Sequence, residues 1–252
     1  MLKFIGTGSA FNTELENNSA YIKYNENLLL IDCGETTFSR IIKLDLLKDV
    51  KNVYIILTHT HSDHIGSVAT LIEYLNIAKG IVPNIVLSNN EKSETEEKVI
   101  TEYLSIQGIQ EDDFDFTYAD MLEDILPDLK KIELVEVKHT KNIPSKSVEL
   151  YFKNFTIYYV SDNNDKTYLK SVSKKLKEND LVYTDCTNKD YPNRAHVLLS
   201  ELAEIFGEEK RKQITTMHFD SYNCIEQSKG YGFKTAEREK SKQEILNNII
   251  KR

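Results

Sequence analysis

Short apolar runs bounded by turn-forming residues predict a chain rich in β-strands. In the first half, such runs predict strands at residues 2–5, 20–24, 28–31, 53–57 and 85–87. In the second half, the corresponding runs cover residues 132–137, 148–152, 155–160, 181–183 and 214–217. Apolar residues at helical spacing predict helices at residues 66–79, 98–106, 168–176, 197–206 and 235–250. Strands and helices therefore recur along the whole chain.

The order of these elements predicts a layered architecture. A predicted β-hairpin comes early in each half, turned at residues 25–27 and at residues 153–154, and the helices are interleaved later. This order predicts an α/β protein (α+β in its mixed sheets), with two mixed sheets packed face to face and helices outside. No segment rich in Gly, Pro or Ser divides the sequence, so a single domain over residues 1–252 is expected.

Composition adds limits on size and location. The chain has 252 residues, of which 40% are hydrophobic, and this is ample for a substantial core. The sequence holds no apolar run of about 18 residues, so no membrane span is expected. Its first residues lack the pattern of a secretory signal. The three cysteines are widely spaced and form no C-x-x-C motif, which favours the reducing cytoplasm as the location.

The formal net charge of −8 argues against one class of partner. Avid binding to long nucleic acids needs clustered Lys and Arg that displace counterions, so no stable nucleic-acid complex is expected. A small anionic substrate stays compatible with this charge, because bound metal ions can supply local positive charge.

Residues 58–64 read Thr-His-Thr-His-Ser-Asp-His and predict a metal site. The run follows a predicted strand and precedes a predicted helix, which is where an α/β sheet presents its ligand-binding residues. His59, His61, Asp63 and His64 are too crowded on one short loop for a single ion, which suggests two ions. A lone histidine is most often a surface or core residue, but three of the six histidines lie in this loop.

Three further candidate ligands each follow an apolar run directly, namely His139, Asp162 and His218. Strand ends would gather them at one rim of the fold. Imidazole and carboxylate suit zinc, and also manganese or iron. A set without cysteine and with an open position is typical of catalytic sites. Two ions can share a water and clamp a phosphoryl group, so two divalent ions are expected, with zinc favoured and manganese as the alternative.

This arrangement resembles the metallo-β-lactamase superfamily. The resemblance rests on the H-x-H-x-D-H motif at residues 59–64, on the three downstream ligands and on Asp32, which matches an acidic supporting position. It implies an αββα sandwich. It also implies a first metal held by His59, His61 and His139, and a second held by Asp63, His64 and His218. Asp162 would bridge the two metals.

Finer motifs resemble the ribonuclease Z-type phosphodiesterases within that superfamily. They are the opening residues 5–10, Asn18-Ser19, and Tyr183-Thr-Asp185-Cys-Thr followed by His196. The resemblance implies that Asp185 orients His196, which protonates the leaving oxygen, and that Asp63 completes the catalytic set. Ribonuclease Z usually carries Glu where this chain has Asp185. A reading of His196 as a helix-start neighbour without catalytic duty stays open.

The short spacing between His139 and Asp162 points to one group within that branch. A hairpin uses most of this interval and leaves no room for the long arm of tRNA-processing members. A short, armless, acidic chain resembles the phage anti-Pycsar phosphodiesterases. This implies a homodimer in the host bacterial cytoplasm that hydrolyses 3′,5′-cyclic nucleotides (cCMP, cUMP, cAMP, cGMP) to nucleoside 5′-monophosphates and so destroys immune signals.

Four other readings remain open from the sequence. They are a ribonuclease Z-type tRNA 3′ endonuclease, a lactonase or thioesterase on the same fold, a module that only sequesters a nucleotide, and a purely structural metal site. Asp185 and His196 favour phosphodiester chemistry over the lactonase. Tyr222, Tyr231 and Phe233, around an expected loop at residues 229–232, form a candidate surface for stacking a base, although ordinary packing is favoured.

Overall fold

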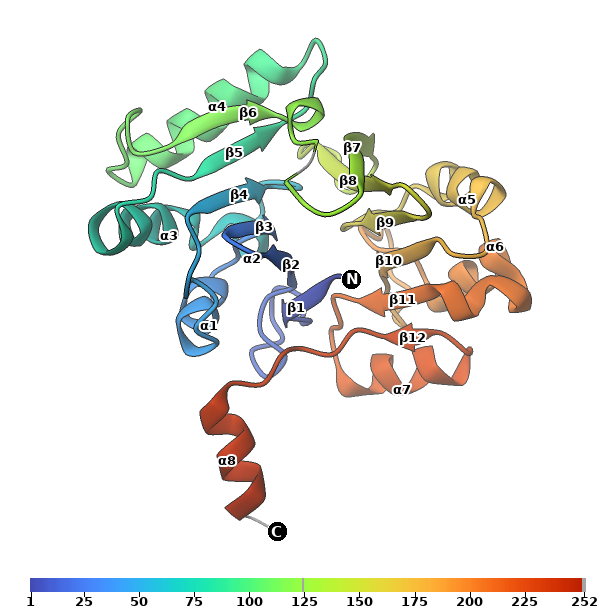
Figure 1. Ribbon diagram of the computed structural model, residues 1–252. Helices are drawn as coiled ribbons and strands as arrows, with labels where there is room; N and C mark the ends of the chain where they lie inside the picture. The colour runs from blue at the N-terminus through green and yellow to red at the C-terminus, as the bar shows by residue number, and fades with distance from the viewer. Residues whose placement is uncertain (124, 251–252) are drawn as a thin grey trace.

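Two six-stranded mixed sheets pack face to face in the computed structural model, which describes residues 1–123 and 125–250 (Figure 1). The first sheet has the order β1-β2-β3-β4-β5-β6, with strands at Lys3–Gly6, Ser19–Tyr24, Asn27–Ile31, Asn52–Ile56, Asn84–Leu87 and Asp115–Tyr118. The second has the order β12-β11-β10-β9-β8-β7, with β7 to β12 at Leu129–Val137, Ser145–Phe152, Thr156–Val160, Leu181–Asp185, Ile214–Met217 and Lys234–Thr235. The predicted pair of mixed sheets is confirmed.

Each sheet begins with antiparallel strands and continues with parallel ones. Strands β1, β2 and β3 are antiparallel, and β4, β5 and β6 then run parallel to β3. The second sheet repeats this plan, with antiparallel β7, β8 and β9 followed by parallel β10, β11 and β12. Parallel neighbours need long crossover connections. The carboxyl ends of the parallel strands in each sheet therefore lie at one edge, where loops can gather ligands.

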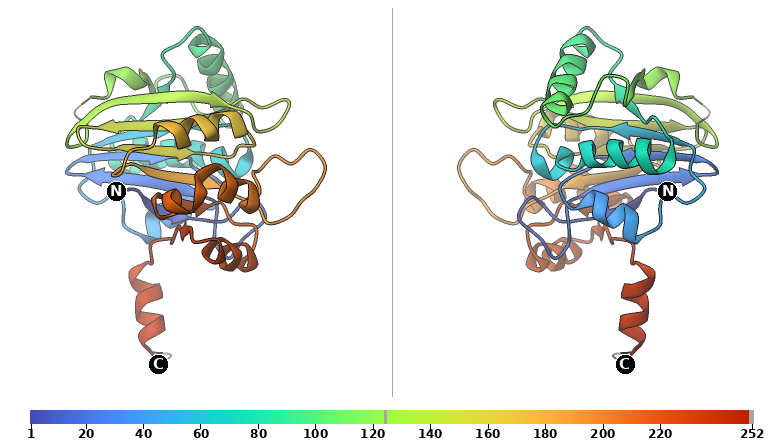
Figure 2. Two further views of the ribbon diagram at one scale, coloured as in Figure 1. Left: turned by 90° about the vertical axis from the view of Figure 1, so that its right-hand side faces the viewer. Right: turned by 90° about the vertical axis from the view of Figure 1, so that its left-hand side faces the viewer.

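Helices cover both outer faces of the sandwich (Figures 1 and 2). The helices of the first half are α1 (Thr37–Lys43), α2 (Ser62–Ile65), α3 (Val68–Tyr74) and α4 (Ser93–Ile106), with a π-helical turn at Leu75–Lys79 and a 3-10 turn at Ala119–Met121. The second half has α5 (Lys166–Lys175), α6 (Leu199–Lys210), α7 (Tyr222–Gly230) and α8 (Lys242–Ile250), with a 3-10 turn at Arg211–Gln213. The expected αββα sandwich is thus observed.

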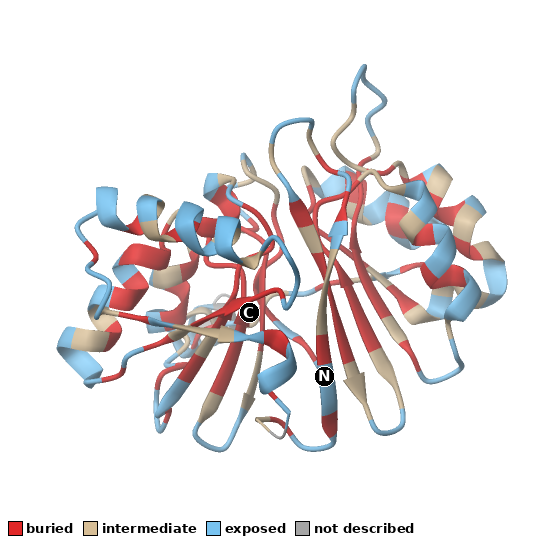
Figure 3. Cartoon of the chain, turned by 90° about the horizontal axis from the view of Figure 1, so that it is seen from above, coloured by how far each residue is buried: buried red, intermediate tan, exposed pale blue. Residues whose placement is uncertain are grey.

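The central strands of both sheets are buried on both faces, which explains their continuous apolar runs (Figure 3). In β3, Leu28 and Leu30 pack with the helices of the first half, whereas Leu29 and Ile31 pack against the second sheet. Three apolar layers result: one between the two sheets and one beneath each helical layer. Burial of this extent is the main source of stability and gives the strand-end loops a rigid base.

The C-terminal segment departs from prediction. A helix was expected over residues 235–250, but α8 begins only at Lys242. Thr235 instead belongs to β12, where it pairs with Thr216 of β11. Helix α8 projects away from the sandwich (Figure 2). Its start is held by the buried guanidinium of Arg40, which lies 2.8 Å from Glu244 and 2.7 Å from Glu16. No helix among the described residues is long and apolar enough to cross a membrane.

Candidate metal centre

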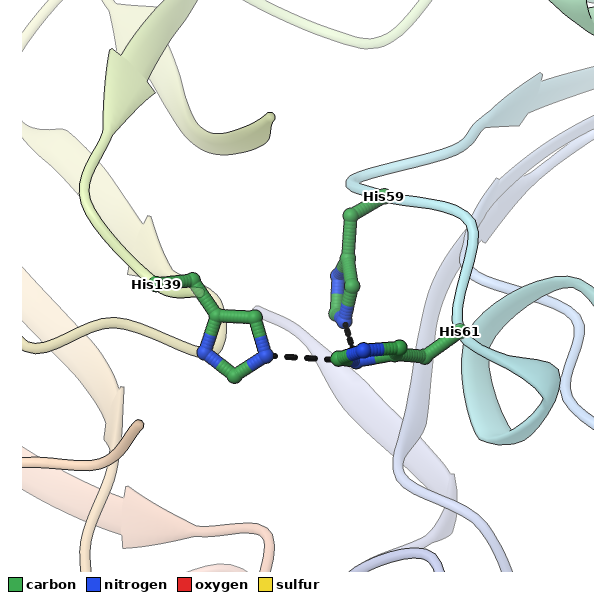
Figure 4. A group of neighbouring side chains, drawn as sticks. All are labelled: His59, His61 and His139. Carbon is green, nitrogen blue, oxygen red and sulfur yellow. Dashed lines mark hydrogen bonds between the residues drawn. The ribbon is translucent and has the colours of Figure 1, made fainter. Parts of the chain in front are cut away.

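The loop after β4 brings two of the predicted ligands together with one from the opposite sheet. His59 and His61 lie between β4 and α2, and His139 follows β7 (Figure 4). Nδ1 of His61 lies 3.0 Å from Nε2 of His59 and 3.2 Å from Nε2 of His139. Three ring nitrogens from three different positions of the chain thus face a common point.

Protons on two of these rings are fixed on the side away from the cluster. Nδ1 of His139 lies 3.0 Å from the carbonyl oxygen of Ala195, which can only accept a hydrogen bond. The Thr58 hydroxyl donates to Asp32, so at 3.1 Å it accepts from Nδ1 of His59. Both Nε2 atoms therefore present lone pairs toward His61. Rings held in this way are typical of metal ligands, whose remaining nitrogen bonds to a carbonyl or another polar group.

Electrostatics favour neutral rings in this three-histidine cluster. Burial lowers the pKa of His139 to about 4 and the pKa of His59 well below its ordinary value. Burial also lowers the pKa of His61. Neutral imidazole is the form that binds metal, so a cation satisfies these nitrogens better than protons do.

A second cluster lies beside the first and combines carboxylates with imidazoles. It contains Asp63, His64, Asp162 and His218, all buried. Nε2 of His218 lies 3.1 Å from Asp63 and 3.3 Å from Asp162, and Nε2 of His64 lies 3.4 and 3.5 Å from the same two carboxylates. Within the described residues, His64 Nε2 and Asp162 Oδ1 form no hydrogen bond although both atoms are buried. Buried polar atoms left unpaired in this way are the expected coordination sites for an ion.

Excess negative charge in this cluster favours the binding of a cation. Burial raises the pKa of Asp162, but the neighbouring His218 and His64 outweigh it and hold that pKa well below its ordinary value. Burial lowers the pKa of His64, but the Asp162 and Asp32 carboxylates outweigh it and hold that pKa well above its usual range. The carboxylates thus draw positive charge to this point, which a divalent ion with oxygen and nitrogen ligands supplies well.

The two clusters meet at Asp162. Its carboxylate belongs to the four-residue cluster and also lies 3.9 Å from Nε2 of His139. All seven residues predicted as ligands from the sequence therefore converge at one edge of the sandwich, on the segments that follow β4, β7, β9 and β11, with Asp63 and His64 in the short helix α2. The donor set of each half fits a divalent metal.

Positive φ angles mark two supporting backbone positions. Asp32 has a φ of 65° and His218 a φ of 57°, in the left-handed region that non-glycine residues seldom adopt. At Asp32 this conformation places the carboxylate 2.8 Å from Nδ1 of His64 and 2.8 Å from the backbone N–H of Thr58. Strained backbone of this kind persists where surrounding contacts hold it, and it is common at functional sites.

His196 lies at the open side of the two clusters and differs from the ligands. Its Nδ1 is 2.7 Å from Asp185, a fully buried carboxylate at the end of β10 that also accepts hydrogen bonds from Asn163. Burial lowers the pKa of His196, but the hydrogen bond with Asp185 and the Asp162 charge outweigh it and raise that pKa to about 9. Its side chain is 22% exposed, against 3% for His218. A charged and accessible ring is suited to proton donation.

Arg194 and Glu201 are a supporting pair that sequence reasoning missed. Arg194 donates a 3.0 Å hydrogen bond to the carbonyl oxygen of His196 and lies 3.0 Å from Glu201. Glu201 also accepts from the backbone N–H of Leu198 at the start of α6. An acidic residue three positions after a helix cap is a recognisable signal, and it could have identified Glu201. The pair fixes the backbone that carries His196.

The candidate stacking residues lie in and beside α7. Phe233 is 5% exposed and packs in the core beneath the helices of the second half. Residues 229–230 end α7, and hydrogen bonds from Tyr231 and Phe233 back to Gln227 and Ser228 close the helix. Packing, the interpretation favoured from the sequence, is thus confirmed for Phe233.

Comparison with solved structures places this site in a known fold. The metallo-β-lactamase fold protein YhfI from Bacillus subtilis matches with a TM-score of 0.67 and 14% identity, covering 95% of this chain and 96% of that protein. A diphosphatase of the PhnP family matches with a TM-score of 0.64 and 18% identity, with 95% of each chain covered. The short form of human tRNase Z has a TM-score of 0.63 and 16% identity, covering 95% and 96%. The predicted metallo-β-lactamase fold is confirmed.

Sequence comparison identifies the family. A protein of Bacillus phage 010DV004, named anti-Pycsar protein Apyc1, is 24% identical over 237 residues, covering 86% of this chain and 88% of the phage protein. A protein of the same name from Paenibacillus xerothermodurans is 28% identical over 237 residues, with 87% of both chains covered. The family model for anti-Pycsar protein Apyc1 matches residues 1–239. As the sequence motifs predicted, this chain belongs to the anti-Pycsar protein Apyc1 family.

Proposed function

We propose that the protein is a phosphodiesterase with two divalent metal ions that hydrolyses 3′,5′-cyclic nucleotides to nucleoside 5′-monophosphates, and that it thereby destroys cyclic nucleotide immune signals. The observation that carries this proposal is the convergence of two buried ligand clusters at Asp162, with the His196–Asp185 pair directly beside them. Membership in a family named for anti-Pycsar activity supports the choice of substrate.

The proposed ligand sets follow the two clusters. His59, His61 and His139 would hold the first ion. Asp63, His64 and His218 would hold the second, with Asp162 between the two. Divalent ions held in this way neutralise phosphate charge and make water a nucleophile near neutral pH. Zinc is favoured by the imidazole-rich set, and manganese is the alternative.

His196 would supply the proton that the leaving oxygen needs. Because Nδ1 bonds to Asp185, the proton available for transfer is on Nε2. In the proposed reaction an oxygen of water forms a bond to phosphorus, the bond from phosphorus to the ribose 3′ oxygen breaks, and the Nε2 proton of His196 passes to that oxygen. Asp185 stabilises the charged ring before transfer and orients it throughout. The exposed edge of the ring lets water restore the proton.

Two rival reactions fit the site less well. Hydrolysis of a lactone or thioester does not require a positioned proton donor of this kind, so the His196–Asp185 pair counts against it. Cleavage of precursor tRNA is disfavoured because β8 and β9 form a hairpin across most of the interval from His139 to Asp162. The net charge of −8 also disfavours a long RNA substrate.

We further propose that the protein is a cytoplasmic homodimer. Sedimentation of the purified protein tests whether it is a dimer.

A hydrolysis panel read by mass spectrometry tests the proposal. Purified protein is incubated with four 3′,5′-cyclic mononucleotides, a cyclic dinucleotide, a 3′-extended tRNA and a lactone, with zinc or manganese, beside a His64→Ala control. Nucleoside 5′-monophosphates formed only by the wild-type protein are the expected result, with two metals per chain by elemental analysis. Intact cyclic mononucleotides would contradict the proposal, and trimmed tRNA or lactone hydrolysis would support the corresponding rival.

A further inference from the structure

A cavity of about 400 Å³ opens directly beside the three-histidine cluster. Helix α4, the ends of β4 and β5, and the strands β7 and β8 form its walls. Most of the surface of the cavity is apolar, and its apolar side chains are Leu57, Val99, Ile100, Leu134 and Pro144, set among polar and charged ones. None of these five residues belongs to the metal clusters, so the cavity is a separate compartment of the site.

The cavity and the three-histidine cluster share their walls. His59 and Thr60 line the cavity, and they belong to the same loop that carries the first ligands. Pro144 lines another side, on the connection from β7 to β8 that also carries His139. A ligand that fills this cavity therefore lies next to whatever occupies the metal centre.

The lining matches a flat, largely apolar ring with a polar edge. A few polar groups in an otherwise apolar pocket are the usual pattern for binding such rings. Here the polar groups include Lys146 and Glu96, which form an ion pair with side chains only 15% and 18% exposed. The pair places a donor and an acceptor side by side without net charge. Nucleobases present the complementary arrangement of neighbouring acceptors and donors on their edges.

The position of His196 relates the leaving oxygen of a cyclic nucleotide to the cavity. The rings of His196 and His139 are 5.4 Å apart, and those of His139 and His59 are 4.9 Å apart, so His139 separates the proton donor from the cavity wall. In a 3′,5′-cyclic nucleotide, the leaving 3′ oxygen and the base occupy non-adjacent carbons of the ribose. With the leaving oxygen at His196, this order of the rings leaves the direction toward His59 and the cavity open to the base.

We propose that this cavity is the nucleobase site of the enzyme. The inference rests on the proposed function, because it places the phosphate of the same substrate at the metal centre. The size of the cavity and the polar groups at its edge accommodate a purine or a pyrimidine. One cavity would therefore bind the bases of different cyclic nucleotides.

Substitutions on α4 test the cavity without touching the metal clusters. Val99 lines the cavity and is 46% exposed, so Val99→Trp fills the space from its rim without disturbing the core. Thr95→Trp does the same from one turn earlier on the helix. Glu102→Trp, on the same helix but outside the cavity, is the matched control. The wild-type chain has no Trp, so indole fluorescence also reports ligand binding in each variant.

Two measurements separate this inference from the proposed function. The first is KM for cyclic nucleotides and for a base-free cyclic ribose phosphate. We expect Val99→Trp and Thr95→Trp to raise KM for the nucleotides by about tenfold or more, with little change for the base-free substrate and none in Glu102→Trp. The second is calorimetry with cytidine and adenosine, which lack phosphate, on protein treated with a chelator.

The calorimetry tests nucleoside binding even if no cyclic nucleotide is hydrolysed. Binding of nucleosides to the wild type and its loss in Val99→Trp would support the base site independently of activity. An unchanged KM in both cavity variants, with nucleosides that give no heat, would overturn the inference. Activity in the wild type together with that outcome would leave the proposed function intact and remove only the base site.

Discussion

Replacement of His196 by Ala tests the proton-donor role most directly. The ring lies 2.7 Å from Asp185 and carries a raised pKa of about 9, so at neutral pH it holds the proton that the leaving oxygen requires. Its side chain contributes little to the buried core, being 22% exposed. His196→Ala should therefore leave the fold and the metal clusters in place and remove only the proton.

The magnitude follows from the chemistry of the removed group. A positioned general acid typically contributes 10²–10⁴-fold to the rate, so kcat should fall by about that factor. This corresponds to a loss of about 3–5 kcal/mol of transition-state stabilisation. Asp185→Asn should lower kcat by a smaller factor, about tenfold, because the ring stays but loses its charged partner. The double variant should be no worse than His196→Ala alone, because Asp185 acts through His196.

A change of leaving group provides the decisive assay. A nucleotide p-nitrophenyl ester releases a stable phenolate and needs no proton from the enzyme, so His196→Ala should cleave it within about fivefold of wild type. Cyclic nucleotide hydrolysis should meanwhile lose the full factor. Equal losses on both substrates, or a fall in bound metal measured by elemental analysis, would refute the proton-donor role and indicate that His196 is a ligand or a structural residue.

Three further predictions concern metal binding and stability. His64→Ala should lose bound metal and activity together, measured by elemental analysis and turnover, because it removes a fully buried ligand. Burial raises the pKa of Glu201, but hydrogen bonds from basic side chains, that of Arg194 first among them, bring it down to about 2. A lowered pKa stabilises the fold at pH values above about 4.5. The free energy of unfolding, measured by urea titration, should therefore fall by on the order of 1 kcal/mol between pH 4.5 and 2 through Glu201. Glu201→Gln should abolish this contribution to the pH dependence. Arg40→Ala removes a buried guanidinium and leaves the partly buried carboxylates of Glu16 and Glu244 without it, so it should lower the free energy of unfolding by about 2 kcal/mol, whereas Lys43→Ala on the same helix should change it little.

The ligand set could be predicted because its signals are local. Four ligands fall within residues 59–64, and their spacing alone indicates metal chemistry. His218 follows the largely buried strand β11, and His139 follows β7, whose apolar residues recur among polar ones, so the strand ends that position them were recognisable. Chemistry carried by strand ends is predictable wherever the strands themselves are strongly apolar.

The elements that were missed have weak or polar patterns. Strand β6 lies at a sheet edge and reads Asp-Phe-Thr-Tyr, and β12 has only two residues, so neither has the apolar run of a central strand. Short helices such as α1 contribute too few turns for a clear period. Residues 235–241 lack a helix because Thr235 gains a strand partner in β11, a long-range contact that local spacing does not record.

Features that depend on side chains from distant segments were beyond prediction. The cavity combines Val99 of α4 with Leu134 of β7, and the support of His196 combines Arg194 with a glutamate on the next helix. Neither pair has a sequence signature that fixes its contact. Sequence reasoning therefore identified the residues of the two His and Asp clusters, whereas the cavity proposed to bind the base could be recognised only in the packed structure.

The charges of the site lead to a last prediction about the order of binding. Four buried carboxylates surround the reaction point, namely Asp32, Asp63, Asp162 and Asp185. The ring charges of His64 and His196 offset only part of them, so these side chains alone repel a phosphate. The two divalent ions that we propose would reverse the sign of the site and would let an acidic chain bind an anionic substrate. A nucleoside 5′-monophosphate should therefore bind metal-loaded protein and fail to bind chelated protein, whereas an uncharged nucleoside should bind both through the cavity. Equal binding of the monophosphate with and without metal would show that some other group holds the phosphate.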